Sequence, residues 1–150
     1  MNRAQKLLAA GAASILVAVP VVSYAADGTL STFAGSVPGF AGDGEAADRA
    51  LRDSPQGMAL TPDGSVLIAD TRNHRVRRVA SGGTIFTVVG SVSGFSGDGG
   101  PAFDAELDTP TDALAAPDGG YWIADSGNHR VRRVAANGTM ALSFACAAAG

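Results

Sequence analysis

The chain repeats itself with a period of 55 residues. The segment TPDGSVLIADTRNHRVRRVA at residues 61–80 returns as APDGGYWIADSGNHRVRRVA at residues 116–135. From residue 28 onward the two copies align without a gap, and about half of the paired positions are identical. A fixed period of this size is typical of proteins in which each copy is one supersecondary unit that cannot bury its own apolar face. The fold is therefore expected to be a stack of small, similar units.

Short runs of β-forming residues alternate with turn residues inside each copy. In the first copy the runs cover residues 57–61, 65–70, 75–80 and 84–90. Pro62-Asp63-Gly64 predicts a tight turn between the first two runs, because proline presets φ, aspartate bonds its own backbone and glycine accepts a positive φ. Four short strands joined by tight turns predict an antiparallel meander, which is the blade of a β-propeller.

The chain is therefore predicted to be all-β, with about two four-stranded blades and an incomplete ring, because propellers need about four to eight blades to close. At most one helical turn is expected, around residues 101–107. A long, glycine-rich connection precedes each blade, at residues 36–55 and 91–110, with Phe40 and Phe95 as its expected anchors. The core between the blades is expected to contain Ile68, Val76, Val79, Ile123, Val131 and Val134.

The order of these motifs resembles the NHL repeat, a family named for an Asn-His-Leu signature. A PDG turn and an apolar run ending in IAD precede Asn73-His74-Arg75 and, in the second copy, Asn128-His129-Arg130. The third letter departs from the family name. The GFxGDG segments at residues 39–44 and 94–99 are similar to those of secreted bacterial NHL proteins. The resemblance covers nearly all residues after about residue 27 and implies a partial β-propeller, but it specifies no activity, because propellers host many unrelated functions.

The amino-terminal segment has the features of a signal peptide. A positively charged start precedes an uncharged apolar run at residues 7–22, and Ser23-Tyr24-Ala25 supplies the small residues that signal peptidase reads. We expect residues 1–25 to be removed and the protein to be secreted or periplasmic, without stable membrane insertion. The alternative is an uncleaved anchor, since residues 7–26 are just long enough to span a bilayer. The single cysteine, Cys146, cannot form an internal disulfide.

Blades are predicted over residues 26–137, with unit boundaries near 28–82 and 83–137. Residues 138–150 are expected to be a degraded last strand or a tail, because the alanine-rich sequence after Met140 is a poor strand former. Either the chain is a fragment of a longer product, or several chains build one ring as a head-to-tail homo-oligomer. In the second case residues 28–35 would form a strand that caps the last blade of a neighbouring chain, or of the same chain by folding back.

Polar residues recur at the turn after the second strand and form the candidate binding set. Each has a structural alternative: Asp and Asn can hold a tight reversal, His can pack in the turn, and Arg can cover a solvated strand face with its stem. Recurrence in both units favours the structural interpretation, because a catalytic residue is needed once and a turn is needed in every blade. The set comprises Asp70, Asn73, His74 and Arg75, with their copies Asp125, Asn128, His129 and Arg130.

Asp43 and Asp98, in the GDG loops, are loop carboxylates that could accept calcium, although the full EF-hand spacing is absent. No other cofactor is expected, and the sequence leaves any metal unknown. Nucleic acid is not an expected partner, because 11 Lys and Arg residues stand against 14 Asp and Glu residues.

The predicted function is that of a secreted scaffold that binds a protein, glycan or cell-wall ligand through its inter-blade loops, rather than an enzyme in itself. The alternative is a fragment of a propeller hydrolase or lyase, resembling the gluconolactonases or the peptide-amidating lyases. Such an enzyme would need a metal site completed by blades that this chain lacks.

Overall fold

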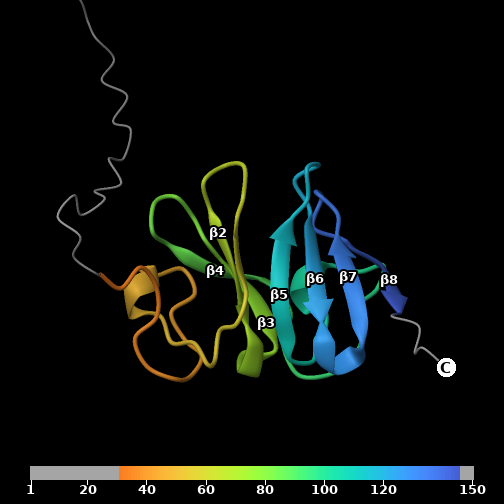
Figure 1. Cartoon of the computed structure of the whole chain (residues 1–150), viewed down its shortest axis with the longest axis horizontal. Helices are drawn as coiled ribbons and strands as arrows, with labels where there is room; N and C mark the ends of the chain where they lie inside the picture. Colours follow the sequence, from red (N-terminus) through yellow and green to blue (C-terminus); the bar gives the residue numbers. More distant parts are fainter. Residues whose placement is uncertain (1–30, 146–150) are drawn as a thin grey trace, which may run out of the picture. The chain divides into compact units, whose positions relative to one another are not determined.

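The computed structural model describes residues 31–145, which form two four-stranded antiparallel sheets in the order in which the strands occur in the chain (Figure 1). This confirms the predicted all-β architecture of two blades without a closed ring. The strands of the first sheet are β1 (Met58–Leu60), β2 (Val66–Asp70), β3 (Arg75–Val79) and β4 (Ile85–Val89). Those of the second sheet are β5 (Pro110–Ala115), β6 (Tyr121–Asp125), β7 (Arg130–Val134) and β8 (Met140–Ala145).

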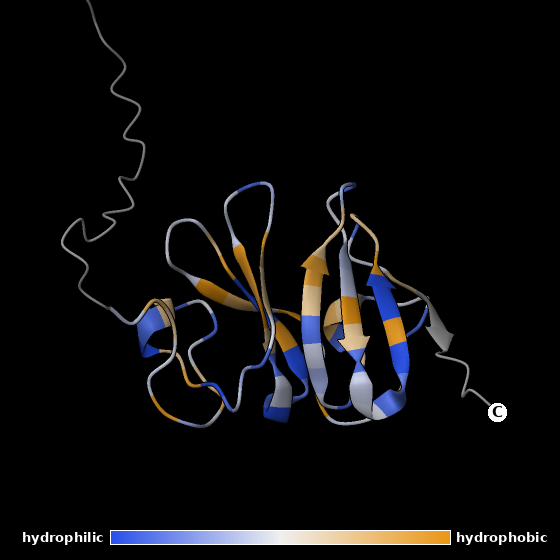
Figure 2. Cartoon of the chain, viewed as in Figure 1, coloured by the Kyte–Doolittle hydropathy of each residue, from blue (hydrophilic) through white to orange (hydrophobic). Residues whose placement is uncertain are grey.

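Turn chemistry sets the strand ends as the sequence predicts. In the turn between β1 and β2, the Gly64 amide donates to the Thr61 carbonyl at 2.9 Å, and Gly64 has a φ of 79°. The Asp63 carboxylate accepts the Ser65 amide at 3.2 Å. Along β7, polar arginines are interspersed with apolar valines, which is visible as bands in Figure 2, whereas β2 is almost continuously apolar.

Short 3-10 turns join the strands at the other end of each sheet. The turns η3 (Thr71–Asn73) and η5 (Ser126–Asn128) each end in a histidine with left-handed backbone, at φ values of 53° and 52°. Two more 3-10 turns lie in the long connections, η2 (Ala47–Arg49) and η4 (Ala102–Asp104). The turn η4 lies where one helical turn was expected, whereas η2 was not anticipated.

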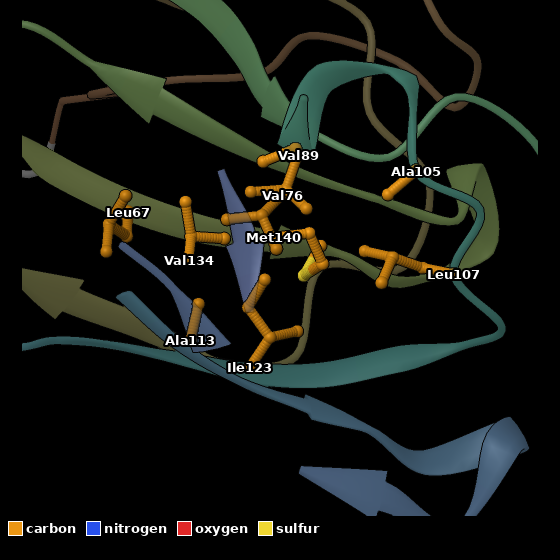
Figure 3. Close-up of a cluster of buried hydrophobic side chains, with 10 residues drawn as sticks. Leu67, Val76, Val89, Ala105, Leu107, Ala113, Ile123, Val134 and Met140 are labelled. Carbon is orange, nitrogen blue, oxygen red and sulfur yellow. The ribbon is translucent and has the colours of Figure 1, made fainter. Parts of the chain in front are cut away.

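The main apolar core lies between the two blades. Figure 3 shows side chains of the first blade, such as Leu67 and Val76, pointing toward Ala113, Ile123 and Met140 of the second. Met140 in this core is fully buried. The stacking of two similar sheets therefore buries apolar surface that one sheet alone would expose.

Five of the six predicted core residues are buried, but Ile68 and Val79 belong to a second cluster, with Ala47, Ala50 and Ile85, and not to the core between the blades. Val131 is not buried. Val131 is 37% exposed, although its counterpart Val76, 55 residues earlier, is fully buried. The difference has a simple physical cause: Val76 is covered by the second blade, whereas Val131 lies on the opposite, uncovered face of that blade.

The structure bears on two expectations about the ends of the repeat region. The segment expected to be a degraded last strand forms β8, which pairs with β7 along Met140–Ala145. Cross-strand pairing thus overrides the weak strand propensity of its alanines. Conversely, residues 31–35 of the expected capping strand 28–35 form no strand, and the edge of β7 that it would cap is occupied by β8.

Other expectations lie outside the described residues, among them the signal peptide at residues 1–25 and Cys146. Within residues 31–145 no helix is long and apolar enough to cross a membrane. The predicted unit boundaries near residues 82 and 83 follow the phase of the sequence repeat, whereas the hydrogen-bonded sheets run over residues 58–89 and 110–145.

Candidate functional site

A buried arginine ties the long connection to the sheet in each blade. Arg77 lies on β3 with no exposed surface. Its guanidinium donates to the carbonyls of Leu51 at 2.7 Å and Ala41 at 3.1 Å, and to the Asp43 carboxylate at 2.6 Å. One side chain therefore holds both ends of the connection that precedes the blade.

The second blade repeats this arrangement with Arg132 on β7, which is also fully buried. Its guanidinium donates to the carbonyls of Glu106 at 2.6 Å and Ser96 at 2.7 Å, and to Asp98 at 2.6 Å. The structural alternative considered for the arginines, a stem covering a solvated strand face, does not apply to Arg77 and Arg132, which are fully buried. The alternation of side chains along a strand could have shown this, because each of the two lies two residues before a buried valine, Val79 or Val134, and so shares its face of the strand.

The predicted Asp and Asn residues meet at the same place. Asp70 is fully buried and accepts the Asp53 amide at 2.8 Å and the Asn73 side-chain amide at 3.0 Å. Asn73 also donates to the Gly39 carbonyl at 2.7 Å. Burial raises the pKa of Asp70, against the effect of these donors and of Arg77.

The second copy follows the same pattern, atom for atom. Asp125 accepts the Asp108 amide at 2.7 Å and the Asn128 amide at 2.9 Å, while Asn128 donates to the Gly94 carbonyl at 2.7 Å. Burial again raises the pKa of the carboxyl group, here Asp125. In both blades the Asp–Asn pair therefore fixes the turn and the connection to each other, which is a structural use of these residues.

Arg75 and Arg130 stack on the predicted aromatic anchors. The Arg75 guanidinium lies 3.6 Å from the centre of the Phe40 ring, and that of Arg130 lies 4.3 Å from the centre of the Phe95 ring. Cation–π contacts of this kind stabilise by about 0.5–1 kcal/mol at exposed sites. Each ring remains more than 40% exposed, so the anchors hold the connection by stacking rather than by burial.

The two histidines have the same backbone but different contacts. Nδ1 of His74 accepts the Thr109 amide of the second blade at 3.1 Å and lies 3.4 Å from the Asp108 carboxylate. His74 is thus a bridge between blades. His129 is exposed, and its side chain forms no hydrogen bond with any residue in the described part of the chain.

Residues 31–145 contain no group of three or more His, Cys, Asp or Glu side chains placed to hold a metal ion. Asp43 and Asp98, the predicted calcium ligands, each bind a buried arginine. Calcium binding stays a prediction.

A groove that the sequence did not reveal lies between the two blades, at the end opposite the His turns. It has a volume of about 430 Å³ and is lined by both PDG turns, Arg78, Ala115 and Tyr121. Ion pairs flank it, because Arg78 binds Asp63 and Arg133 binds Asp118. Hydrogen bonds from the Thr61 hydroxyl and then from the Ser65 amide lower the pKa of Asp63 to about 2. Those from Arg133 and the Gly120 amide lower the pKa of Asp118.

The family model of the NHL repeat matches residues 53–79 and 107–134, so that each match begins just before the first strand of a sheet and ends with the third. The two blades are NHL repeats. The NHL signature therefore coincides with the turn in which Asp, Asn and His are fixed, and the resemblance inferred from the PDG, IAD and NHR segments is confirmed.

Relatives of these NHL repeats occur in much larger proteins. The chain is 35% identical to human Teneurin-4 over 105 residues and 30% identical to human Teneurin-1 over 99 residues. These matches cover 61% and 57% of this chain but only 4% of either relative. A Bacteroides thetaiotaomicron protein of unknown function has a similar solved structure, with a TM-score of 0.55 and 30% identity over 60% of this chain and 23% of that one.

Proposed function

We propose that this chain is a secreted NHL-repeat scaffold that binds a glycan or protein ligand through the surface between its blades. The observation that carries the proposal is the groove between the two PDG turns, which is formed by both blades together. Ligand sites are concave and combine apolar surface with a few fixed polar groups. Tyr121, two prolines and the flanking ion pairs give this groove that composition.

The contacts that hold the two PDG turns support the same function. The Thr61 hydroxyl and the Ser65 amide donate to Asp63, and the ion pairs with Arg78 and Arg133 tie the turns to the third strands. At the opposite end of the blades, Arg77, Arg132 and the Asp–Asn pairs hold the connections and the His turns. A binding surface held in place before the ligand arrives loses less conformational entropy on binding. The polar residues predicted as ligand contacts thus serve a binding scaffold indirectly, by fixing its loops.

The test is a binding assay of the full chain against a panel of glycans, peptidoglycan fragments and peptides. Tyr121→Val gives the groove the residue that the first repeat carries at Val66, so it is a change that the blade tolerates. We expect it to weaken binding about tenfold, equivalent to about 1.4 kcal/mol. Phe86→Val, which alters an exposed aromatic residue outside the groove, is the control.

If Tyr121→Val leaves binding unchanged, the ligand site does not lie in the groove. Absence of binding, combined with stoichiometric metal and hydrolysis of a lactone or ester panel, would instead support the fragment of a propeller hydrolase or lyase.

A further inference from the structure

The second blade leaves uncovered the face that the first blade buries. We call this the trailing face, and it consists of Leu114, Trp122, Ala124 and Val131. In the first blade the counterparts Leu67, Ala69 and Val76 are fully buried against the second blade. On the trailing face, by contrast, Val131 is 37% exposed, Leu114 is 53% exposed, and Trp122 and Ala124 are partly exposed. A hollow lined by these four residues lies on this face.

The first blade leaves its opposite face uncovered. We call this the leading face, and it consists of Pro55, Met58 and Leu60. Met58 is 66% exposed, whereas its counterpart Ala113 is 1% exposed against the first blade. Leu60 is 75% exposed, and Pro55 is exposed whereas its counterpart Pro110 is buried. The chain therefore carries both halves of a blade-to-blade junction, one at each end.

The polar side chains that connect the two blades also have counterparts one period later, which face no further blade in the described part of the chain. Within the chain, the Thr71 hydroxyl donates to the Pro110 carbonyl at 2.8 Å, and His74 accepts the Thr109 amide at 3.1 Å. One period later the side chain in the donating position is Ser126 and the one in the accepting position is His129, and both are exposed. Among residues 31–145, the Ser126 hydroxyl contacts only its own blade, at Thr111 and Ala124.

The matching backbone groups lie at the start of the leading face. Ser54 and Pro55 stand one period before Thr109 and Pro110. Ser54 has a φ of 50°, close to the 42° of Thr109, although a non-glycine residue rarely adopts such a value. The segment therefore already has the left-handed backbone with which its counterpart presents an amide to a histidine.

We propose that the leading face of one chain stacks on the trailing face of a second copy, as the two blades stack within one chain. His129 then accepts the Ser54 amide of the neighbouring copy, and Ser126 donates to its Pro55 carbonyl. Met58 and Leu60 pack against Trp122 and Leu114, and the flexible Met58 side chain adapts to the larger residues there. No strand is exchanged, because β8 already completes the second sheet.

A second copy fits these faces because the two halves complement each other by the chain's own repeat. The contact is head to tail, so it forms a ring if the rotation closes. For copies that each contribute the two described blades, a propeller of about four to eight blades would hold about two to four copies.

The first experiment measures the mass of the full chain by light scattering over a range of concentrations. We expect a discrete oligomer. Leu114→Asp should dissociate it and raise the dissociation constant at least about tenfold, because the new carboxylate would be buried in the contact without a partner. Phe103→Asp is the matched control, since it also places an acid at an exposed apolar residue and its counterpart is Asp48. It should leave the oligomer unchanged. A monomer at all concentrations overturns the proposal.

The second experiment locates the contact in a Cys146→Ser background. Chains carrying Ser54→Cys are mixed with tagged chains carrying His129→Cys and treated with a short bismaleimide. We expect cross-linked heterodimers, and none when Ser81→Cys, an exposed serine in the turn between β3 and β4, replaces Ser54→Cys. Deletion of residues 28–35 should not dissociate the oligomer. Equal cross-linking of both pairs, or dissociation by the deletion, overturns blade stacking. Neither readout uses the ligand of the proposed function, so the two proposals fail independently.

Discussion

Arg77 and Arg132 are the residues on which the connections between blades depend. Each is fully buried, and each donates to two backbone carbonyls and one carboxylate of the connection. A buried guanidinium without partners would be costly. Arg77 has a partner at each of its three nitrogens, whereas Nε of Arg132 has no hydrogen-bond partner among the described residues.

Replacing Arg77 by methionine should lower the free energy of unfolding by about 3 kcal/mol, because Asp43 and two carbonyls lose their donor. Urea denaturation of the full chain measures this loss of unfolding free energy. Arg78→Met is the control, since Arg78 pairs with the exposed Asp63 and should contribute less than about 1 kcal/mol. Similar losses for the two variants would contradict the assigned role of Arg77.

The turn carboxylates Asp63 and Asp118 should make the free energy of unfolding depend on pH in the acid range. Their folded pKa values are lowered, that of Asp63 from 3.8 to about 2, so the unfolded chain binds more protons in this interval. Their stabilisation is complete above pH 3.8 and is lost as the pH falls toward 2. Asp70 and Asp125, with raised pKa values, act in the opposite direction at higher pH.

The double variant Asp63→Asn/Asp118→Asn should therefore show a flatter fall of unfolding free energy below about pH 4 than the unaltered chain. Urea denaturation at a series of pH values measures the slope. An unchanged slope would show that other groups dominate the acid transition.

At the scale of elements, the turns η3 and η5 form a matched pair. Both end in a left-handed histidine, but only His74 bonds the next blade. His74→Ala should therefore cost about 1 kcal/mol more than His129→Ala, the contribution of one hydrogen bond, while the backbone strain is common to both. His74→Ala and His129→Ala should be compared in chains that also carry Leu114→Asp, because no second copy then covers His129. Equal losses would mean that the contact of His74 with Thr109 contributes nothing.

The strands could be predicted because tight turns separate short runs of β-forming residues in both copies. Three features escaped prediction, each for a tertiary reason. The strand β8 forms from alanine-rich sequence because β7 offers an edge. Val131 is exposed because burial depends on a neighbouring blade, which a repeat pattern does not place. The groove was invisible because it arises where two turns, 55 residues apart, approach each other.

The candidate residues were predicted as a set, and their partners were not. Recurrence favoured a structural role for the Asp–Asn pairs, and the two pairs form corresponding contacts in the two blades. Periodicity could not show that Asn73 reaches back to Gly39, since that contact spans 34 residues of irregular connection.

At the scale of the whole molecule, the shared core couples the two blades. Leu67 and Val76 of the first blade and Ile123 and Met140 of the second are buried in one cluster. We expect a single unfolding transition, in which the fluorescence of Trp122, the only tryptophan, follows the same urea curve as the far-UV circular dichroism. Separate curves would show that one blade persists without the other.

The gapless period also has a genetic consequence. Because the junction positions recur after 55 residues, unequal crossing-over between the copies would insert or delete one whole blade wherever the exchange occurs. Each recombinant would keep its turns, its arginine anchors and its strand register, since contacts in such arrays run between neighbours only. The number of blades that such a gene encodes can therefore change in a single event that preserves the repeat.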